Sequence, residues 1–255
     1  MHKVLTVVQA RLGSTRLPGK VLLPLIDKPM VEHIVERITY AKTVDAICIA
    51  TSDAESDEPL VAFAEIKGWP VVRAPVDDLV LRLHRALTVN DADIMVRCWG
   101  DCPCVDPAVI DLAIQKLLQD NLDFVSNSVT VGRSYPYGLD IEVYRREVLA
   151  YMAQAVEDPF YREFPSEFVK QSGRYRLGEI RCEQDYSNIF VTVDYPEDLA
   201  LVRALYQDLY PLNPAFGYQE IVDWVTKRQE QGALHAVTEL PRNIEYYEKK
   251  QNHDS

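Results

Sequence analysis

Apolar residues recur along the chain in two alternating patterns. Short, nearly continuous apolar runs are typical of strands buried on both faces of a parallel sheet. Between them lie stretches with apolar residues three and four positions apart, as on one face of a helix. The predicted strands cover 4–8, 46–51, 71–73, 94–98, 123–127, 139–144 and 188–194. The predicted helices are one that follows Pro29, then 57–67, 78–89, 107–119, 146–157, 199–209 and 218–231.

This alternation of strand and helix predicts one three-layer α/β/α domain over residues 1–243, built on a Rossmann-like mixed sheet. Ligand sites in such sheets lie beyond the carboxyl ends of the strands. The 128–187 segment is the least regular part and is interpreted as an insertion. Residues 21–25 are expected to be a short extended piece, and 244–255 a polar, loosely held tail.

Charge and composition narrow the possible partners. The chain has 255 residues and a formal net charge of −12, which argues against nucleic acid or an anionic membrane as the main partner. No apolar run approaches the roughly 20 residues that a membrane span needs, and the first residues lack signal-peptide architecture. Five cysteines, an odd and scattered number, suit a reducing compartment. We therefore expect a cytoplasmic protein.

A loop rich in cations follows the first predicted strand. Its chemistry-bearing residues are Arg11, Gly13, Ser14, Thr15, Arg16, Gly19 and Lys20. We call residues 10–20 the cation loop. Its glycines permit unusual backbone conformations, its hydroxyls and amides donate hydrogen bonds, and its arginines match phosphate oxygens. The loop therefore predicts a polyphosphate site, and the alternative is an ordinary solvated basic loop.

Two aspartates follow apolar runs at distant positions in the sequence. Asp101 comes after the strand predicted at 94–98, and Asp194 ends the one predicted at 188–194. If these strands are neighbours in the sheet, both carboxylates emerge at the edge where the cation loop lies. Mg²⁺ commonly takes one or two carboxylates together with phosphate oxygens and waters, so we predict a magnesium site. The alternative for each residue is a helix cap or a turn.

Two further acidic pairs have to be weighed. Asp91 and Asp93 form a D-x-D sequence, a feature of metal-dependent glycosyltransferases, but they precede a strand and are therefore interpreted as a turn at the opposite edge of the sheet. Asp140 and Glu142 would share one face of a strand. That face either meets substrate hydroxyls or is solvated, and the spacing does not choose between these readings.

Five motifs in series resemble the cytidylyltransferases that activate acidic sugars, most closely the spore-coat polysaccharide biosynthesis protein F group. The resemblance rests on residues 9–20, on 50–53, on Arg97 with 100–103, on 138–142, and on 192–194 with 196–199. It implies a GT-A-like nucleotidyltransferase fold, CTP and Mg²⁺ as ligands, pyrophosphate release, a CMP-sugar product and a homodimer. The 128–187 segment would supply sugar and dimer contacts.

The resemblance also implies a role for each matched residue. Catalysis would depend on Arg11, Arg16, Lys20 and Asp101. The nucleotide would be bound by Gln9, Ala10, Arg11, Gly13, Ser14, Thr15, Arg16, Lys20, Thr51, Ser52, Asp53, Arg97 and Asp101. The sugar-like acceptor would be bound by Asn127, Tyr137, Asp140 and Glu142. The metal would be held by Asp101 and Asp194.

One stretch departs from the family pattern. Residues 162–168 read Arg-Glu-Phe-Pro-Ser-Glu-Phe, where the group typically carries a Glu-His-Val-Thr-Pro-like stretch. The acceptor is therefore expected to differ from that of close relatives, while the nucleotide chemistry is not. Two alternatives stay open: a glycosyltransferase that consumes a nucleotide sugar, and a non-catalytic nucleotide-binding partner of a glycan-assembly enzyme.

Overall fold

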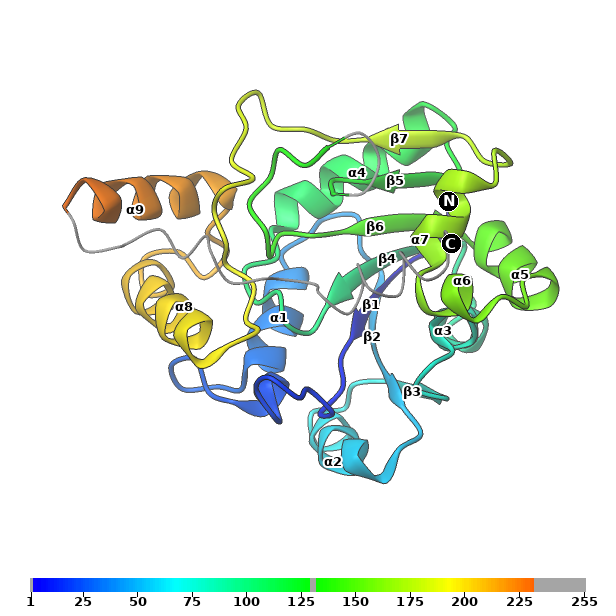
Figure 1. Cartoon of the computed structure of the whole chain (residues 1–255), viewed down its shortest axis with the longest axis horizontal. Helices are drawn as coiled ribbons and strands as arrows, with labels where there is room; N and C mark the ends of the chain where they lie inside the picture. Colours follow the sequence, from blue (N-terminus) through cyan, green and yellow to red (C-terminus); the bar gives the residue numbers. More distant parts are fainter. Residues whose placement is uncertain (1, 129–131, 232–255) are drawn as a thin grey trace.

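A mixed sheet forms the centre of the computed structural model, which describes residues 2–128 and 132–231. The strand order is β3-β2-β1-β4-β6-β5-β7 (Figure 1). Strands β1 to β4 run parallel to one another, and β6 is antiparallel to both of its neighbours. The bounds are β1 Val4–Gln9, β2 Ala46–Ser52, β3 Val71–Ala74, β4 Ile94–Trp99, β5 Phe124–Ser126, β6 Glu142–Arg145 and β7 Leu177–Glu179.

Helices cover both faces of the sheet, because both faces of its central strands are apolar. The helices are α1 Met30–Ile38, α2 Glu58–Ile66, α3 Leu79–Val89, α4 Pro107–Gln119, α5 Arg146–Ala155, α6 Pro159–Glu163, α7 Pro165–Gln171, α8 Pro196–Leu209 and α9 Tyr218–Glu230. One apolar cluster joins the sheet to α1, α4, α8 and α9, and a second joins it to α3, α5 and α7. The predicted three-layer α/β architecture is confirmed.

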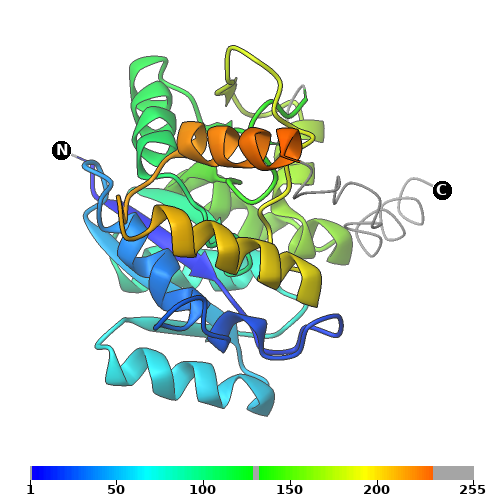
Figure 2. The ribbon, with the colours of Figure 1, turned by 90° about the vertical axis from the view of Figure 1, so that its left-hand side faces the viewer.

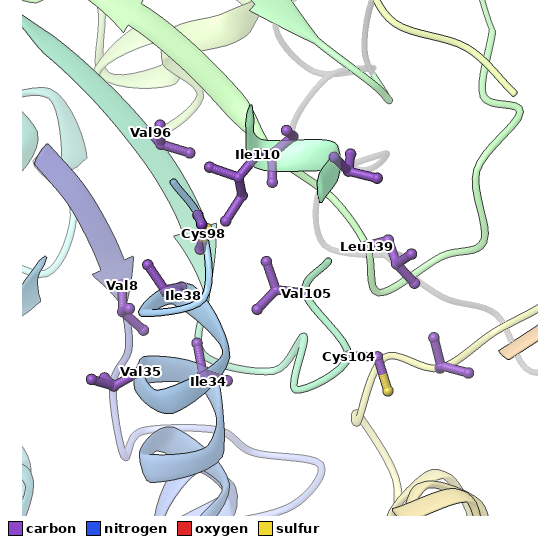
Figure 3. Close-up of a cluster of buried hydrophobic side chains, with 14 of the residues drawn as sticks. Val8, Ile34, Val35, Ile38, Val96, Cys98, Cys104, Val105, Ile110 and Leu139 are labelled. Atoms are coloured by element: carbon purple, nitrogen blue, oxygen red, sulfur yellow. The ribbon is translucent and has the colours of Figure 1, made fainter. Parts of the chain in front are cut away.

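The first cluster is the larger of the two and lies between the sheet and α1. Val8 of β1 and Cys98 of β4 face Ile34 and Ile38 of α1 across this layer (Figure 3). Turned by 90°, the molecule shows α8 and α9 lying outside α1 on the same side (Figure 2). These helices close the layer that supports the carboxyl ends of β1 and β4.

Two strand predictions have to be corrected. The 188–194 segment is extended but forms only an isolated bridge, between Phe190 and Tyr137. Its backbone bonds reach Tyr137 on one side and Asp101 on the other; both lie in loops, so no regular ladder develops. The strand predicted at 139–144 is the shorter β6, Glu142–Arg145. Its residues Glu142, Val143 and Tyr144 are all buried, because the two apolar clusters cover opposite faces of this inner strand.

Two segments are more regular than predicted. Residues 20–22 form a 3₁₀ turn instead of an extended piece, because Gly19 takes a left-handed conformation with φ of 67° and reverses the chain. The described part of 128–187 contains β6, α5, α6, α7 and β7, and so extends the sheet and covers one of its faces. The tail predicted at 244–255 lies outside the described residues.

The helices are short. The longest of those in the described ranges, α8, has 14 residues. Within these ranges no helix combines the length and the apolarity that crossing a membrane requires.

Candidate active site

The cation loop folds back on its own backbone directly after β1. The Leu12 carbonyl accepts hydrogen bonds from the amides of Ser14 (2.9 Å) and Gly19 (3.2 Å). The left-handed Gly19 then turns the chain so that the next side chain, Lys20, points inward and is 7% exposed. Arg11 remains exposed on the loop. The loop therefore separates one buried cation from cations that face the solvent.

Lys20 lies between the two predicted metal ligands. Its Nζ donates to Asp101 Oδ2 at 2.8 Å, to Asp194 Oδ1 at 3.0 Å and to the Val193 carbonyl at 2.9 Å. Arg16 Nη2 also donates to Asp194 Oδ1, at 2.7 Å. We call Lys20, Asp101, Asp194 and Arg16 the Lys20 cluster. The sequence predicted that the loop and both carboxylates meet, and they do, although Asp194 is not carried by a regular strand.

Lys20 and Asp101 stabilise each other in their charged forms. Burial acts to lower the pKa of the Lys20 ammonium, but the Asp101 and Asp194 carboxylates outweigh burial, and this pKa lies above its ordinary value. Burial acts to raise the pKa of Asp101, but the Lys20 ammonium outweighs it, and that pKa is lowered. The contact between Lys20 and Asp101 is therefore an ion pair at neutral pH.

The backbone brings Asp101 and Asp194 together by close approach. A Cβ atom at Gly100 would lie 2.7 Å from the Cβ of Ala10, so only glycine lets β4 end this close to the cation loop. The Asp101 carbonyl then accepts from the Val193 amide at 2.8 Å. These contacts hold the 190–194 segment against the end of β4, and they fix the positions of both carboxylates.

Asp57 anchors the cation loop to the end of β2. This side chain is 1% exposed and accepts from the Leu12 amide (2.7 Å), the Thr51 hydroxyl (2.8 Å), the Ser52 amide (3.1 Å) and the Ser52 hydroxyl. Burial acts to raise its pKa, but these donors outweigh burial and lower it. The structure therefore places the predicted nucleotide ligands Thr51 and Ser52 against Asp57. Asp53, next along the chain, is exposed.

A second ion pair lies buried at the same end of the sheet. Arg97 Nη1 binds Glu142 Oε2 at 2.7 Å, and Arg97 Nε donates to Gln9 Oε1 at 2.8 Å. The Tyr144 hydroxyl donates to Glu142 Oε2 at 2.6 Å. Burial, and then the Glu142 carboxylate, raise the pKa of Tyr144 well above its ordinary value. The network connects two predicted nucleotide-binding residues to one predicted acceptor-binding residue.

The predicted acceptor side carries an aromatic pair and an arginine. Tyr137 stacks on Phe190 with ring centroids 4.7 Å apart, and the Arg133 guanidinium lies 3.6 Å from the Tyr137 ring centroid. Arg133 also forms an ion pair with Asp140. Asn127 bonds the Leu139 carbonyl (2.6 Å) and the Ile141 amide (2.9 Å), so it shapes the chain around this cluster. Asp140 and Glu142 therefore have different partners, and the structure does not place them on one strand face.

Gly138 presses this acceptor segment against the chain that carries Asp194. Its φ is 103°, and a Cβ at this position would lie 2.5 Å from the Thr192 nitrogen. The Tyr137 carbonyl accepts from the Val191 amide at 2.7 Å. Tyr137 and Asp101 therefore bond to the same extended segment, which also carries Phe190.

The oxygens around the Lys20 ammonium could hold a divalent cation if the ammonium moved away. One oxygen of Asp101, one of Asp194 and the Val193 carbonyl all lie within 3.0 Å of a single point, the Lys20 nitrogen. Hard cations such as Mg²⁺ prefer this donor set. Among residues 2–128 and 132–231, no group of three or more His, Cys, Asp or Glu side chains converges as a metal site. Further ligands for Mg²⁺ would come from phosphate and water.

The D-x-D sequence lies where a turn was predicted. Asp91 has φ of 45°, and the Asp93 carboxylate accepts from the Lys3 amide at 2.8 Å, at the start of β1. Arg146 Nη2 pairs with Asp91 at 3.1 Å. Both aspartates therefore belong to the sheet edge opposite the cation loop, as their position before β4 indicated.

The atypical 162–168 stretch forms the end of α6 and the start of α7. Arg162 pairs with Asp78, which caps α3 by accepting from the Leu81 amide at 2.9 Å. The same arginine also donates to the Val156 carbonyl, at 3.2 Å. The stretch therefore joins α6 to the start of α3. Its effect on acceptor choice stays a hypothesis.

Asp57 and Arg133 were missed by the sequence reasoning. The only sequence signal for Asp57 is a carboxylate shortly after the hydroxyl pair Thr51-Ser52, and for Arg133 it is a cation just before the turn-forming 135–138 stretch. Neither signal names a partner, because Asp57 also binds the distant Leu12 amide and Arg133 meets Tyr137 and Asp140 only through the turn between them.

Comparison with known proteins gives consistent results. Residues 5–220 match the family model described as cytidylyltransferase. The chain is 31% identical to the spore coat polysaccharide biosynthesis protein SpsF of Bacillus subtilis (strain 168) over 215 residues, which cover 81% of this chain and 88% of the relative.

Solved structures show the same fold. A cytidylyltransferase from Leptospira borgpetersenii serovar Hardjo-bovis (strain JB197) superposes with a TM-score of 0.82 at 28% identity, over 94% of this chain and 99% of the other. A CMP:2-keto-3-deoxy-manno-octonic acid synthetase complexed with CTP superposes with a TM-score of 0.60 at 26% identity, over 80% and 98%. On its sequence, its fold and the family model that spans most of its length, the chain belongs to the cytidylyltransferase family.

Proposed function

We propose that this protein transfers a cytidylyl group from CTP to a sugar-like acceptor, an acidic sugar or a related molecule, and releases pyrophosphate. The observation that carries the proposal is the Lys20 cluster beside the cation loop, at the sheet edge where the parallel strands end. Family membership and the CTP in the related synthetase support the choice of nucleotide. The name of the Bacillus subtilis relative supports a role in polysaccharide biosynthesis.

The cation loop would bind the triphosphate. Arg11 and Arg16 lie on its exposed side and supply forked donors, while its amides and hydroxyls at Gly13, Ser14 and Thr15 supply further ones. The nucleoside would lie against the ends of β1, β2 and β4. The residues proposed there are Gln9, Ala10, Thr51, Ser52, Asp53 and Arg97.

The reaction would be an in-line attack of an acceptor oxygen on the α-phosphorus, with pyrophosphate as the leaving group. Such a transfer needs positioning and charge neutralisation rather than a covalent intermediate. Lys20, Arg11 and Arg16 would neutralise charge on the phosphates. Asp101 and Asp194 would hold Mg²⁺, which when bound supplies further neutralisation of the phosphate oxygens.

The acceptor would bind beside the aromatic pair of Tyr137 and Phe190. Apolar sugar faces pack on aromatic rings, and sugar hydroxyls bond to charged side chains such as Arg133 and Asp140. Asn127 would keep the acceptor segment in shape, and Glu142 would act through Arg97. We also propose, from the family resemblance, that the protein is a cytoplasmic homodimer with dimer contacts from 128–187; light scattering of the purified protein tests the dimer.

The proposal is tested by measuring pyrophosphate release with Mg²⁺, a panel of acidic sugars, and each of CTP, UTP, GTP and ATP. We expect release with CTP and at least one acceptor. Asp101→Asn and Lys20→Ala should greatly reduce it, while Asp91→Asn, the same amide change on the opposite sheet edge, should not. Parental rates in the first two variants would show that the site is elsewhere.

Thermal shift separates the proposal from a non-catalytic binding role. A nucleotide that binds the folded protein raises its melting temperature with the logarithm of saturation. Stabilisation by CTP without turnover over the whole acceptor panel would favour the binding role. Consumption of a nucleotide sugar without pyrophosphate would favour the glycosyltransferase.

A further inference from the structure

Lys20 uses its full bonding capacity on the two carboxylates and one carbonyl. An ammonium group has three N–H donors, and Lys20 directs them at Asp101, Asp194 and the Val193 carbonyl at 2.8, 3.0 and 2.9 Å. The side chain is 9% exposed, and that of Asp194 is 6% exposed. The ammonium therefore occupies the position from which a single cation can contact both carboxylates.

The charges of the Lys20 cluster are already balanced. Lys20 and Arg16 bring two positive charges, and Asp101 and Asp194 bring two negative ones. A divalent cation added to this set would meet an ammonium and a guanidinium within a few ångströms, in a buried place where water screens charge weakly. Neutral sites of this kind do not attract a free metal ion.

We propose that Lys20 and the divalent cation compete for the same two carboxylates, so that the protein takes up the metal together with the nucleotide and binds the free metal weakly. The inference rests on the proposed function, since it assigns the carboxylates to a metal. It goes further by making Lys20 the residue that selects the metal–nucleotide complex as the substrate form.

Binding of the nucleotide would allow the metal to replace Lys20 at the carboxylates. Its phosphates offer Lys20 and Arg16 new anionic partners on the cation loop, and they bring the negative charge that a divalent cation requires. Lys20 starts a single 3₁₀ turn directly after the left-handed Gly19, at the base of the cation loop, and Arg16 is one-third exposed, so phosphates bound on the loop lie within reach of both side chains. Asp101 and Asp194 are then free to contact the metal, whose other ligands are phosphate and water.

The opposite arrangement is a preformed metal site that Lys20 merely borders. In that case removing the lysine charge would leave affinity for the free metal nearly unchanged, because metal and ammonium would use different oxygens. The two arrangements therefore predict different results for a variant that lacks the ammonium. Lys20→Met is suitable, since it keeps the apolar stem of a buried side chain and removes the charge.

The experiment measures Mn²⁺ binding without nucleotide, by electron paramagnetic resonance of the free ion. Shared carboxylates predict that Lys20→Met binds Mn²⁺ at least about tenfold more tightly than the parent, since one adjacent positive charge is removed. CTP should raise the Mn²⁺ affinity of the parent by a larger factor than that of the variant. Lys116→Met, which removes an ion-paired lysine from the surface of α4, is the matched control and should change neither value.

Adding Asp101→Asn to Lys20→Met should abolish the gain in Mn²⁺ affinity, which places the ion at the shared carboxylates. A folded Lys20→Met protein, with a parental circular dichroism spectrum, that binds Mn²⁺ no better than the parent would overturn the inference. That measurement needs neither CTP nor turnover. The inference can therefore fail while cytidylyl transfer is observed, and it can hold while the proposed reaction fails.

Discussion

Two ion-pair networks lie at the same end of the sheet, and they differ in what surrounds them. In the Lys20 cluster, Asp101 is 28% exposed and Asp194 is shared by two cations, one of which reaches the solvent. In the second network, Arg97 and Glu142 are 8% and 2% exposed and pair one to one. The first network borders the solvent, whereas the second is enclosed within the sheet.

The comparison shows that the solvent exposure of a carboxylate–cation pair limits what the pair can do. A carboxylate at the boundary, such as Asp101, can gain new interactions in a transition state. A carboxylate sealed beneath its neighbours, such as Glu142, can only hold other side chains in place. We therefore expect substitutions at Asp101 to affect mainly turnover and substitutions at Glu142 to affect mainly stability.

The largest effect is expected from Asp101→Asn. Loss of one charge that positions the metal and Lys20 should lower kcat for pyrophosphate release by about a thousandfold. The melting temperature should change little, because the amide retains the shape of the side chain and Asp101 is partly exposed. A large loss of stability with normal turnover would contradict the division between the two networks.

Glu142→Gln tests the sealed network. It leaves the Arg97 charge buried without a counter-charge, and we expect a loss of about 3 kcal/mol in the free energy of unfolding, measured in urea. A double variant with Arg97→Met should lose less than the sum of the single changes, since no unpaired charge remains. Kinetic constants that fall while stability is retained would instead assign Glu142 to the reaction.

Arg133→Met extends the comparison to the acceptor side. Because Arg133 lies over Tyr137 and beside Asp140, its loss should raise the KM for the acceptor by roughly tenfold, the effect of one lost charged hydrogen bond. The KM for CTP should stay at the parental value. Equal changes in both constants would argue for a general structural role.

The smallest effect is expected from pH acting on His33, which lies in the core away from both networks. Burial, and then the Lys28 ammonium, lower the pKa of His33 from its ordinary 6.5, although Glu36 and Asp27 oppose the shift. The unfolded chain therefore binds a proton that the folded protein resists. Its contribution to stability is complete above pH 6.5 and is lost as the pH falls towards the lower folded pKa.

Urea unfolding between pH 5 and 7 measures this contribution. His84 has a pKa lowered mainly by burial and adds to the same slope. His33→Phe, which keeps the ring contacts with Tyr206 and Tyr210, should reduce the slope without abolishing it. An unchanged slope in this variant would show that His33 takes up its proton equally well in both states.

Part of the site could be predicted from the sequence because its positions follow from strand ends. The cation loop leaves β1 and Asp101 leaves β4, and neighbouring parallel strands end at the same edge of a sheet. Residues such as Asp57 and Arg133 could not be assigned in this way. Asp57 acts through the Leu12 amide, 45 positions away, and no local pattern encodes that contact.

Burial and pairing are different properties, and this explains the error at 188–194. Ile189, Val191 and Val193 are buried, so the apolar residues of this segment do mark a buried, extended chain. A strand also needs a regular partner, and this segment has only loop residues beside it. The position of β6 inside the sheet, where both of its faces are covered, likewise could not be predicted, because the sequence does not reveal the order of the strands.

The direction of β6 has a consequence for how the protein can change. Because β6 is antiparallel, it begins at the edge where β1 and β4 end, and Glu142 lies opposite Arg97. The chain therefore enters the sheet at this edge through residues 132–141, which include Tyr137 and Asp140, both proposed to contact the acceptor. Tyr137 in this connecting segment is bonded to Ile189 and Val191, in the chain that leads to Asp194, so a change in the segment would also act on the Lys20 cluster. Under the proposed function, a change of acceptor preference through this segment would therefore have to keep these backbone contacts.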